Sequence, residues 1–314
     1  MKTIRTIVAG LAELKEDDPI LLLALDLARR ADAKLHLVHA YELPQLFTMS
    51  PGLDMVYPEG TARYGEEMQE LLEAVVRRHP DGENAGCHAV LGSPAAVLRG
   101  EAARLRADLV VVGAARRSRL GMRILGTTAQ RVLRSVSVPV LVARAALHRA
   151  PHRVLLTSDL SELSAPVHEK ALDVLDGLYA LDFMELRSLM VVGLEFVPPP
   201  LGREGLGRMA RGELERFLQA RRPRPLEVEP AVRVGDVAVE IVDELAEWNA
   251  DLLVVGTHAR HGWSRLWLGS VAEACIRDAP CSVLAIPPVS VERKAEEAPD
   301  AAAVADALAP PVAV

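Results

Sequence analysis

The segment with the clearest chemical potential runs from Gly256 to Ser270, with the sequence GTHARHGWSRLWLGS. It follows the apolar run 252–255, which is typical of a strand buried on both faces, and open α/β sheets bind ligands at the carboxyl ends of such strands. Ser270 and Glu273 have the S-x-x-E spacing of a capping box, which predicts a helix start. A helix N-terminus suits phosphate, and Gly256 and Gly269 would let a ligand approach the backbone.

The same segment also has a purely structural interpretation, in which Ser270 only caps a helix and the two glycines only make turns. Its histidines, His258 and His261, have no carboxylate or cysteine at a recognisable ligand spacing. The pair His36 and His39 is disfavoured as well, because residues three apart on a strand face opposite sides. No metal site is therefore predicted.

Enzyme motifs are missing from the sequence. It has no G-x-x-x-x-G-K-[ST] loop and no G-x-S-x-G elbow. Residues 205–210 fit G-x-G-x-x-A, but they follow three prolines rather than a strand, so we interpret them as a loop that enters a helix. No nucleophile or general base stands out, so the sequence does not predict an enzyme or efficient hydrolysis.

The elements that position this segment occur twice. Residues 107–113 (ADLVVVG) match residues 250–256 (ADLLVVG) at an offset of 143 residues. The same offset, without a gap, pairs Gly126 with Gly269 and Thr127 with Ser270. Two apolar strands that were similar by chance would not keep both glycines in register across the intervening loop. The offset therefore indicates a duplicated domain.

Each copy alternates predicted strands and helices. In the first copy strands are predicted over 4–10, 34–40, 87–91, 109–112 and 138–142, and helices over 20–30, 63–78 and 94–105. In the second copy strands are predicted over 154–157, 187–193, 227–234, 252–255 and 282–286, and helices over 167–175, 209–220 and 237–248. A last helix precedes the fifth strand in both. This order predicts a parallel sheet with helices on both faces.

The Gly256–Ser270 segment resembles the signature of the universal stress protein family, G-x2-G-x9-G-(S/T). Residues 154–161 resemble the family's first strand and its acidic residue, and residues 279–284 resemble its last strand. The resemblance implies two tandem Rossmann-like domains of the adenine nucleotide alpha hydrolase-like type, each with a five-stranded parallel sheet. We place these domains at 1–146 and 152–289, followed by an acidic, Ala/Pro-rich tail at 290–314 that we expect to be disordered.

The resemblance also implies a nucleotide site in the second domain. In nucleotide-binding members the acidic residue contacts adenine, and the glycine loop with its Ser or Thr holds ribose and phosphates. Carried over residue by residue, the contacts come from Thr157, Asp159, Val255, Gly256, Ala259, Gly269, Ser270 and Val271. Ala259 departs from the pattern, because the family has its second glycine there. A left-handed backbone at this position would cost a non-glycine residue about 1–2 kcal/mol.

The first domain departs further from the family pattern. Gly113, Gly126 and Thr127 match, but Arg116 stands at the second glycine and Leu11 falls about where the acidic residue should be. We therefore expect this domain to be degenerate and mainly structural.

The resemblance favours a stress-response regulator that binds ATP, ADP or AMP. The alternative is a nucleotide-free dimerisation or interaction module with a structural glycine loop. An enzyme of the ATP-pyrophosphatase type is disfavoured, because the serine- and glycine-rich first-strand loop of such enzymes is absent. Family domains pair through their last strands, so 138–142 and 282–286 are expected to meet within the chain, and a homodimer of the tandem chain is also conceivable.

Composition narrows the setting. The chain has 314 residues, 50% of them hydrophobic, and a formal net charge of −7, which argues against nucleic acid or an anionic membrane as the main partner. Three cysteines, with no signal-peptide pattern, favour a reducing, cytoplasmic location.

Overall fold

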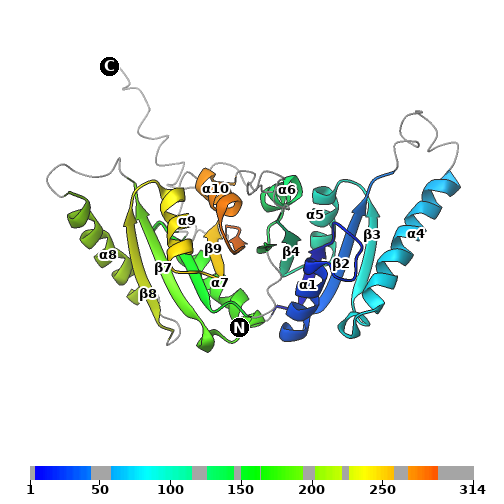
Figure 1. Cartoon of the computed structure of the whole chain (residues 1–314), viewed down its shortest axis with the longest axis horizontal. Coiled ribbons are helices and arrows are strands. Elements are labelled where there is room, and N and C mark those ends of the chain that lie inside the picture. The colour runs from blue at the N-terminus through cyan, green and yellow to red at the C-terminus, as the bar shows by residue number, and fades with distance from the viewer. Residues whose placement is uncertain are drawn as a thin grey trace, which may run out of the picture.

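The computed structural model describes residues 4–43, 58–114, 126–144, 150–162, 164–193, 202–220, 226–257 and 268–288. These residues form two halves with the same order of strands and α-helices (Figure 1), and each half adds one 3-10 helix at a different place. The first half contains β1 (Thr6–Gly10), α1 (Pro19–Ala31), β2 (Lys34–Tyr41), α4 (Pro58–Arg77), η1 (Pro80–Gly82), β3 (Gly86–Leu91), α5 (Pro94–Arg104), β4 (Leu109–Gly113), α6 (Thr127–Ser135) and β5 (Val140–Ala143). The second half contains β6 (Arg153–Ser158), α7 (Ser164–Leu178), η2 (Leu181–Phe183), β7 (Glu185–Val192), α8 (Gly202–Ala220), β8 (Val228–Val234), α9 (Val237–Glu247), β9 (Leu252–Gly256), α10 (Ser270–Asp278) and β10 (Ser282–Ile286).

The tandem α/β arrangement predicted from the sequence is confirmed, with one local correction. Helix α8 begins at Gly202, and residues 205–210 therefore lie inside a helix rather than in a loop that leads to one. The dinucleotide-like glycine spacing in this stretch is thus not a phosphate-binding turn.

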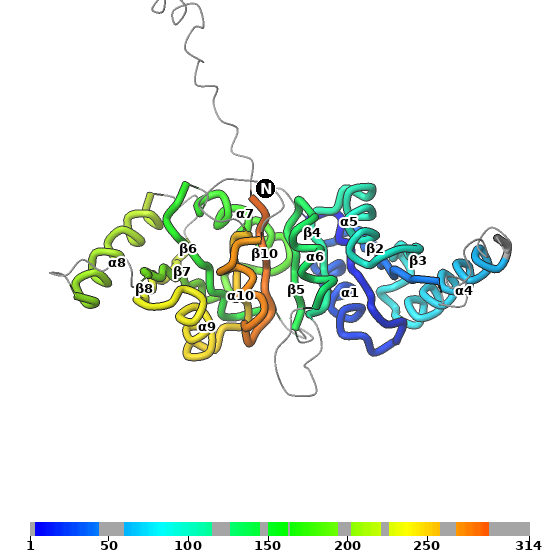
Figure 2. The backbone as a smooth tube through the Cα atoms, turned by 90° about the horizontal axis from the view of Figure 1, so that it is seen from above, coloured from blue at the N-terminus to red at the C-terminus, as the bar shows by residue number. Residues whose placement is uncertain are grey.

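The described strands form one sheet in the order β3-β2-β1-β4-β5-β10-β9-β6-β7-β8. Pairing is parallel within each half, whereas β5 and β10 pair antiparallel where the halves meet. Figure 2 shows these two strands side by side in the middle of the molecule, with α6 and α10 beside them. The fifth strand of each half therefore has a hydrogen-bonded neighbour on both sides.

A pseudo-two-fold axis runs through this junction. Leu141 pairs with Leu284, and the Gln130 side chain donates to the Glu273 carboxylate. In both pairs the partners are counterparts in the repeat, 143 residues apart. Under two-fold symmetry only residues at the axis meet their own counterparts, so these two contacts locate the axis.

Apolar side chains cover both faces of the sheet. One core contains residues of α1, α4 and α7, such as Leu21, Leu72 and Val174. The other contains residues of α5, α6, α9 and α10, such as Leu98 and Leu245. Each core includes residues of both halves, so apolar burial is continuous across the junction. This two-sided burial explains why β4 and β9 are uniformly apolar.

Each half has the same side-chain to backbone hydrogen bonds at the amino end of its first strand, β1 or β6. The Asp108 carboxylate accepts hydrogen bonds from the backbone N–H groups of Arg5 and Thr6, at 2.9 and 3.0 Å. Asp251 accepts in the same way from His152 and Arg153, both at 2.9 Å. Each aspartate thus ties the start of its fourth strand to the start of the first, which keeps the carboxyl ends of these strands in register.

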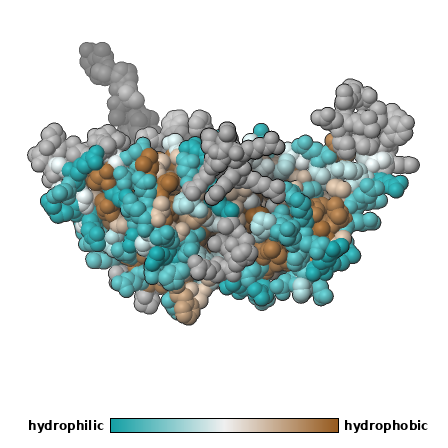
Figure 3. All heavy atoms as spheres, in the orientation of Figure 1, coloured by the Kyte–Doolittle hydropathy of each residue, from teal (hydrophilic) through white to brown (hydrophobic). Residues whose placement is uncertain are grey.

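The outer surface is mixed in character. Figure 3 shows apolar residues in separate small patches among hydrophilic ones on this face. No helix in the part of the chain that the structure describes is both long and apolar enough to cross a membrane.

One buried polar group breaks the apolar pattern. Ser188 on β7 is fully buried, and its hydroxyl has no hydrogen-bond partner among the described residues. The strand registers place Leu37 at the counterpart position in the first half, where it is also fully buried. The same site in the two halves therefore holds an apolar side chain in one case and an unpaired hydroxyl in the other.

This difference predicts opposite outcomes for two matched substitutions. Ser188→Ala should leave the free energy of unfolding unchanged or raise it by about 1 kcal/mol, because it removes an unpaired buried hydroxyl. Leu37→Ala should lower the free energy of unfolding by about 2–5 kcal/mol, because it leaves a cavity. Urea denaturation followed by circular dichroism measures both, and a clear loss of stability in Ser188→Ala would contradict the prediction.

Candidate functional site

A cleft of about 650 Å3 lies in the second half, at the carboxyl ends of β6, β7, β9 and β10. The strands of this half are parallel and ordered β10-β9-β6-β7-β8. Strands β7 and β8 lie on one side of β6, and β9 and β10 lie on the other, so the topological switch point is between β6 and β9. Open parallel sheets bind ligands at such a switch point. The volume lies within the 300–1,000 Å3 that is usual for small-molecule sites.

The cleft brings together every described residue predicted for the site. These residues are Thr157, Asp159, Val255, Gly256, Gly269, Ser270 and Val271. Ala259, His258 and His261 lie outside the described residues. Sequence reasoning missed the rest of the walls, which include Ser161, Ser164, Val167, Val191, Ile241, Ile286 and Pro288.

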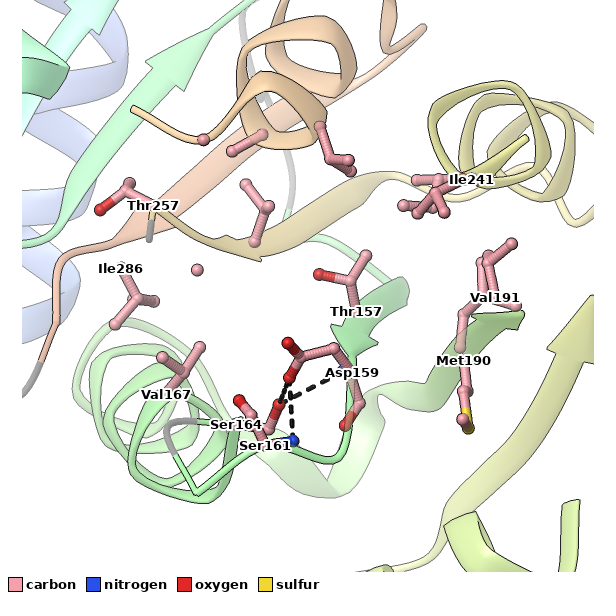
Figure 4. A pocket seen from close by; sticks show the side chains of 18 of the residues that line it. Thr157, Asp159, Ser161, Ser164, Val167, Met190, Val191, Ile241, Thr257 and Ile286 are labelled. Carbon is pink, nitrogen blue, oxygen red and sulfur yellow. Dashed lines mark hydrogen bonds between the residues drawn. The ribbon is translucent and has the colours of Figure 1, made fainter. Parts of the chain in front are cut away.

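Asp159 is held in a fixed orientation at one side of the cleft (Figure 4). Its Oδ1 accepts hydrogen bonds from the Ser164 hydroxyl at 2.6 Å and from the Ser161 N–H at 3.0 Å. The Asp159 N–H in turn donates to Ser164 Oγ at 3.3 Å. These bonds join the end of β6 to the start of α7, so the carboxylate is positioned by the turn that carries it.

The backbone reverses sharply right after Asp159. Leu160 has φ 56°, in the left-handed region that costs a non-glycine residue about 1–2 kcal/mol. Its N–H donates to Ser158 Oγ at 3.3 Å, which helps to hold the turn. Non-glycine residues in this region persist only where the surroundings enforce them, and they often mark functional sites.

His168 of α7 contacts the carboxyl end of β6. Its Nε2 lies 3.0 Å from the Thr157 carbonyl oxygen, and its ring packs edge-on against Phe217 with centroids 5.7 Å apart. His168 is buried. This imidazole therefore occupies a structural place beneath the cleft.

The start of α10 corrects the predicted capping box. Gly269, not Ser270, is the N-cap residue, and no side chain caps the helix. The first half is the same, with Gly126 as the N-cap of α6 and Thr127 as its first residue. Glu273 does not reach back to the helix start but pairs with Gln130 and Arg134 of the first half.

Among the described residues, the first backbone N–H groups of the helix therefore have no hydrogen-bond partner, and they lie at the cleft. The Glu273 N–H bonds the Gly269 carbonyl at 2.9 Å and makes the first intrahelical bond. The amides of residues 270–272 thus precede the helical ladder, and all three residues line the cleft. The Gly269 N–H donates to the Thr257 carbonyl at 3.1 Å, which ties the two ends of the glycine loop together.

The cleft has a lining of mixed character. Its described lining combines apolar walls with hydroxyl groups and one carboxylate, that of Asp159, and contains no Lys, Arg or His. Thiol chemistry is disfavoured too, because burial raises the pKa of Cys275 and of Cys281 to about 12. The one carboxylate of the described lining accepts a hydrogen bond from the Ser164 hydroxyl, and no group of three or more metal-ligating residues occurs among the described residues.

The first half differs from this site at the carboxyl end of its first strand, β1. The strand registers place Ala12, rather than the predicted Leu11, at the position of Asp159. Gly10 replaces Thr157, and a Cβ at Gly10 would lie 2.7 Å from Leu98 Cδ1. The Leu98 side chain thus lies against the end of β1, and His39 Nδ1 lies 3.0 Å from the Leu11 carbonyl oxygen. Arg116 lies outside the described residues.

His36 and His39 do not meet, as expected from their spacing. His36 Nδ1 instead lies 3.0 Å from His88 Nε2 on the neighbouring strand, and His88 lies near Glu101 and Arg104 of α5. Burial is the main cause that lowers the pKa of both imidazoles below 6.5. The neighbouring His88 also lowers the pKa of His36, Arg104 lowers both pKa values, and Glu101 raises both.

The chain was also compared with known proteins. A family model described as the Universal stress protein family matches residues 3–144 and 151–287. A universal stress protein of Mycolicibacterium smegmatis is 30% identical over 190 residues, which are 58% of this chain and 62% of that protein. Universal stress protein A homolog 2 of Coxiella burnetii is 42% identical over 55 residues, which are 18% of this chain and 37% of that protein. The matches thus span less than two thirds of these curated relatives.

Among solved structures, a universal stress protein from Archaeoglobus fulgidus matches with a TM-score of 0.58 and 17% identity. The match covers 91% of this chain and 97% of that chain. At this identity the likeness concerns the fold, and it extends over both halves.

The histidine pair predicts a loss of stability in mild acid. Because folding lowers both pKa values, the unfolded chain takes up protons first as the pH falls below about 6.5. Stability is therefore complete above that pH and declines below it. The double variant His36→Gln/His88→Ala should show a smaller fall in the free energy of unfolding between pH 7 and pH 5 than the wild type.

Urea titrations at several pH values measure this difference. The exposed His152, changed to Gln, serves as the control and should keep the wild-type dependence. An equal fall in the double variant and the wild type would show that the pair does not cause the pH dependence.

Proposed function

The chain belongs to the universal stress protein family, and we propose that the cleft in its second half binds an adenine nucleotide, ATP, ADP or AMP, in a protein that regulates a response to stress. One observation carries the proposal. A single cleft joins a fixed carboxylate, Asp159, to the exposed amides at the start of α10. These two features lie more than 100 residues apart in the sequence and suit the two ends of a nucleotide.

The base end of the cleft combines flat apolar walls with a hydrogen-bond acceptor. Val191 and Ile241 line the side of the cleft opposite Ser164 and Val167 (Figure 4). Apolar walls of this kind favour an aromatic base, while a few fixed polar groups set its orientation. In this proposal the Asp159 carboxylate accepts a hydrogen bond from the exocyclic amine of adenine.

The phosphate end is the start of α10. Backbone N–H groups at residues 270–272 and the positive end of the helix dipole attract an anion, and the Ser270 hydroxyl adds a donor. A Cβ at Gly256 would lie 3.4 Å from Val167, so packing within the protein does not require glycine there. The bare backbone instead leaves space on the cleft side, where ribose or phosphate would lie.

Binding without efficient hydrolysis is the proposed activity, because the one carboxylate of the described lining, that of Asp159, is bonded to Ser161 and Ser164 and is assigned to the base rather than to the phosphates. The competing hypothesis is an interaction module whose glycine loop only shapes a helix start. The two hypotheses differ in one observable, namely whether the purified protein holds or takes up nucleotide.

Asp159→Asn tests the base contact. Asparagine retains an acceptor for Ser164 and Ser161 but loses the charge, so we expect ATP binding about tenfold weaker with little change in folding. Isothermal titration calorimetry measures the affinity, and Asp182→Ala is the control. Asp182 is an exposed residue of η2, before the amino end of β7. The variant should therefore bind ATP like the wild type.

The outcome that favours the interaction module is also defined. Denaturing the purified wild-type protein would release no nucleotide, and titration with millimolar ATP would give no heat of binding.

Ala259→Gly tests the departure from the family's glycine pattern. If the methyl group forces strain or crowds the ligand, glycine should tighten ATP binding by about tenfold. Arg116→Ala, at the corresponding position of the first half, should leave both affinity and stoichiometry unchanged. Equal effects of the two substitutions would contradict the assignment of the site to the second half.

A further inference from the structure

Helix α10 is held by the first half at both of its ends. In its first turn, the Glu273 carboxylate accepts hydrogen bonds from Gln130 and from Arg134, the latter at 2.7 Å. At its last turn, the Arg144 guanidinium donates to the carbonyl oxygens of Ile276 and Arg277, the latter at 2.5 Å. The Arg144 N–H also donates to Ser282 Oγ, at the start of β10, at 3.2 Å.

The second half does not return these contacts among the described residues. The counterpart of Arg134 is Arg277, which pairs with Asp278 of its own helix. The counterpart of Arg144 is Pro287, which has neither a guanidinium nor an N–H group to donate. The counterpart of Ser282 is Pro139, which has no hydroxyl to accept. Of the two residues at the pseudo-two-fold axis, only Glu273 carries a charge, and Gln130 does not. Among the described residues, these side-chain hydrogen bonds between the fifth-strand end and last helix of one half and the last helix of the other therefore run in one direction, from the first half to α10.

The physical setting makes this support significant. Helix α10 has only nine residues, and helices this short depend on tertiary contacts for their stability. Its last carbonyls form the negative end of the dipole, where the Arg144 cation is favourable. Its first turn carries the unpaired amides of residues 270–272 that line the cleft. Fixing the helix at both ends therefore fixes the direction of these amides.

We propose that the first half is a positioning element for the ligand-binding helix of the second half, with Arg144 as its main positioning residue and Gln130 and Arg134 as secondary ones. The nature of the ligand rests on the proposed function, whereas the immobilisation of α10 does not. Arg144 touches no residue of the cleft lining in these contacts, so its effect on binding passes through the helix. The contribution concerns the phosphate end of the cleft, because the base end is built by β6, α7 and α9.

Amide hydrogen exchange on the full chain tests the immobilisation without any ligand. In Arg144→Ala, amides of residues 273–278 should exchange about tenfold faster, as expected for loss of a charged hydrogen bond, while those of α6 stay unchanged. Arg144→Lys, which keeps the charge but not the fork, should give an intermediate rate. Arg131→Ala, an exposed arginine of α6, is the matched control and should leave α10 unchanged.

Two outcomes of the exchange experiment would overturn the inference. One is wild-type exchange of α10 in Arg144→Ala. The other is equal acceleration of α6 and α10, which would make Arg144 a general interface residue rather than a one-way support.

Calorimetry with ATP and with adenosine then tests positioning against a merely structural role. Arg144→Ala should weaken ATP binding by about tenfold and adenosine binding much less; equal losses for both would contradict the role at the phosphate end. If the wild type binds neither compound, the proposed function fails, and hydrogen exchange alone decides the inference.

Discussion

The antiparallel pairing of β5 with β10 is the constraint on which the rest of the structure depends. Each half alone would end in a short, buried and mainly apolar strand with one row of unpaired backbone groups, which is a template for unwanted association. Pairing the two strands satisfies those groups and makes the apolar layers continuous across the junction. The two-fold relation then brings α6 against α10. The helix that begins at the cleft is, for this reason, also the helix at the junction.

The two halves have equivalent hydrogen bonds to the backbone but differ in the interactions between their side chains. Asp108 and Asp251 make the same pair of bonds at the start of the sheet. By contrast, the counterparts Glu101 and Glu244 have different partners. Glu101 pairs with Arg104 near a histidine pair, whereas Glu244 pairs with Arg187 and Arg233, at 2.5 and 2.6 Å. A cluster that contains two histidines in one half thus corresponds to an arginine–glutamate network in the other.

Sequence patterns predicted the fold well because the signals that specify it are local and repeated. The apolar runs of β4 and β9, the alternation of strands and helices, and the offset of 143 residues all lead to the observed sheet. The predicted start of α8 was wrong, because its glycines are typical of a loop and only packing against the sheet makes this stretch helical. The acidic position in the first half was also one residue off, since register depends on pairing between strands.

The candidate site was predictable only in part, for a related reason. Asp159 and the start of α10 were identified because they carry unusual residue types, and the structure brings them into one cleft. The walls at Val191 and Ile241 have the same apolar pattern as core residues, so nothing local distinguishes them. The S-x-x-E pattern at Ser270 predicted a capping box and was wrong, because Glu273 has partners in the other half.

The contrast between the halves lies at the base end rather than the phosphate end. Both have a glycine N-cap followed by a hydroxyl residue at the start of the last helix, so the elements suited to an anion are present twice. At the end of the first strand, Thr157 and Asp159 correspond to Gly10 and Ala12. The first half thus lacks a counterpart of the Asp159 carboxylate, yet its Gln130, Arg134 and Arg144 contact α10. A change at the end of β1 alters no contact with the cleft, whereas a change at the end of β5 reaches it through one short helix.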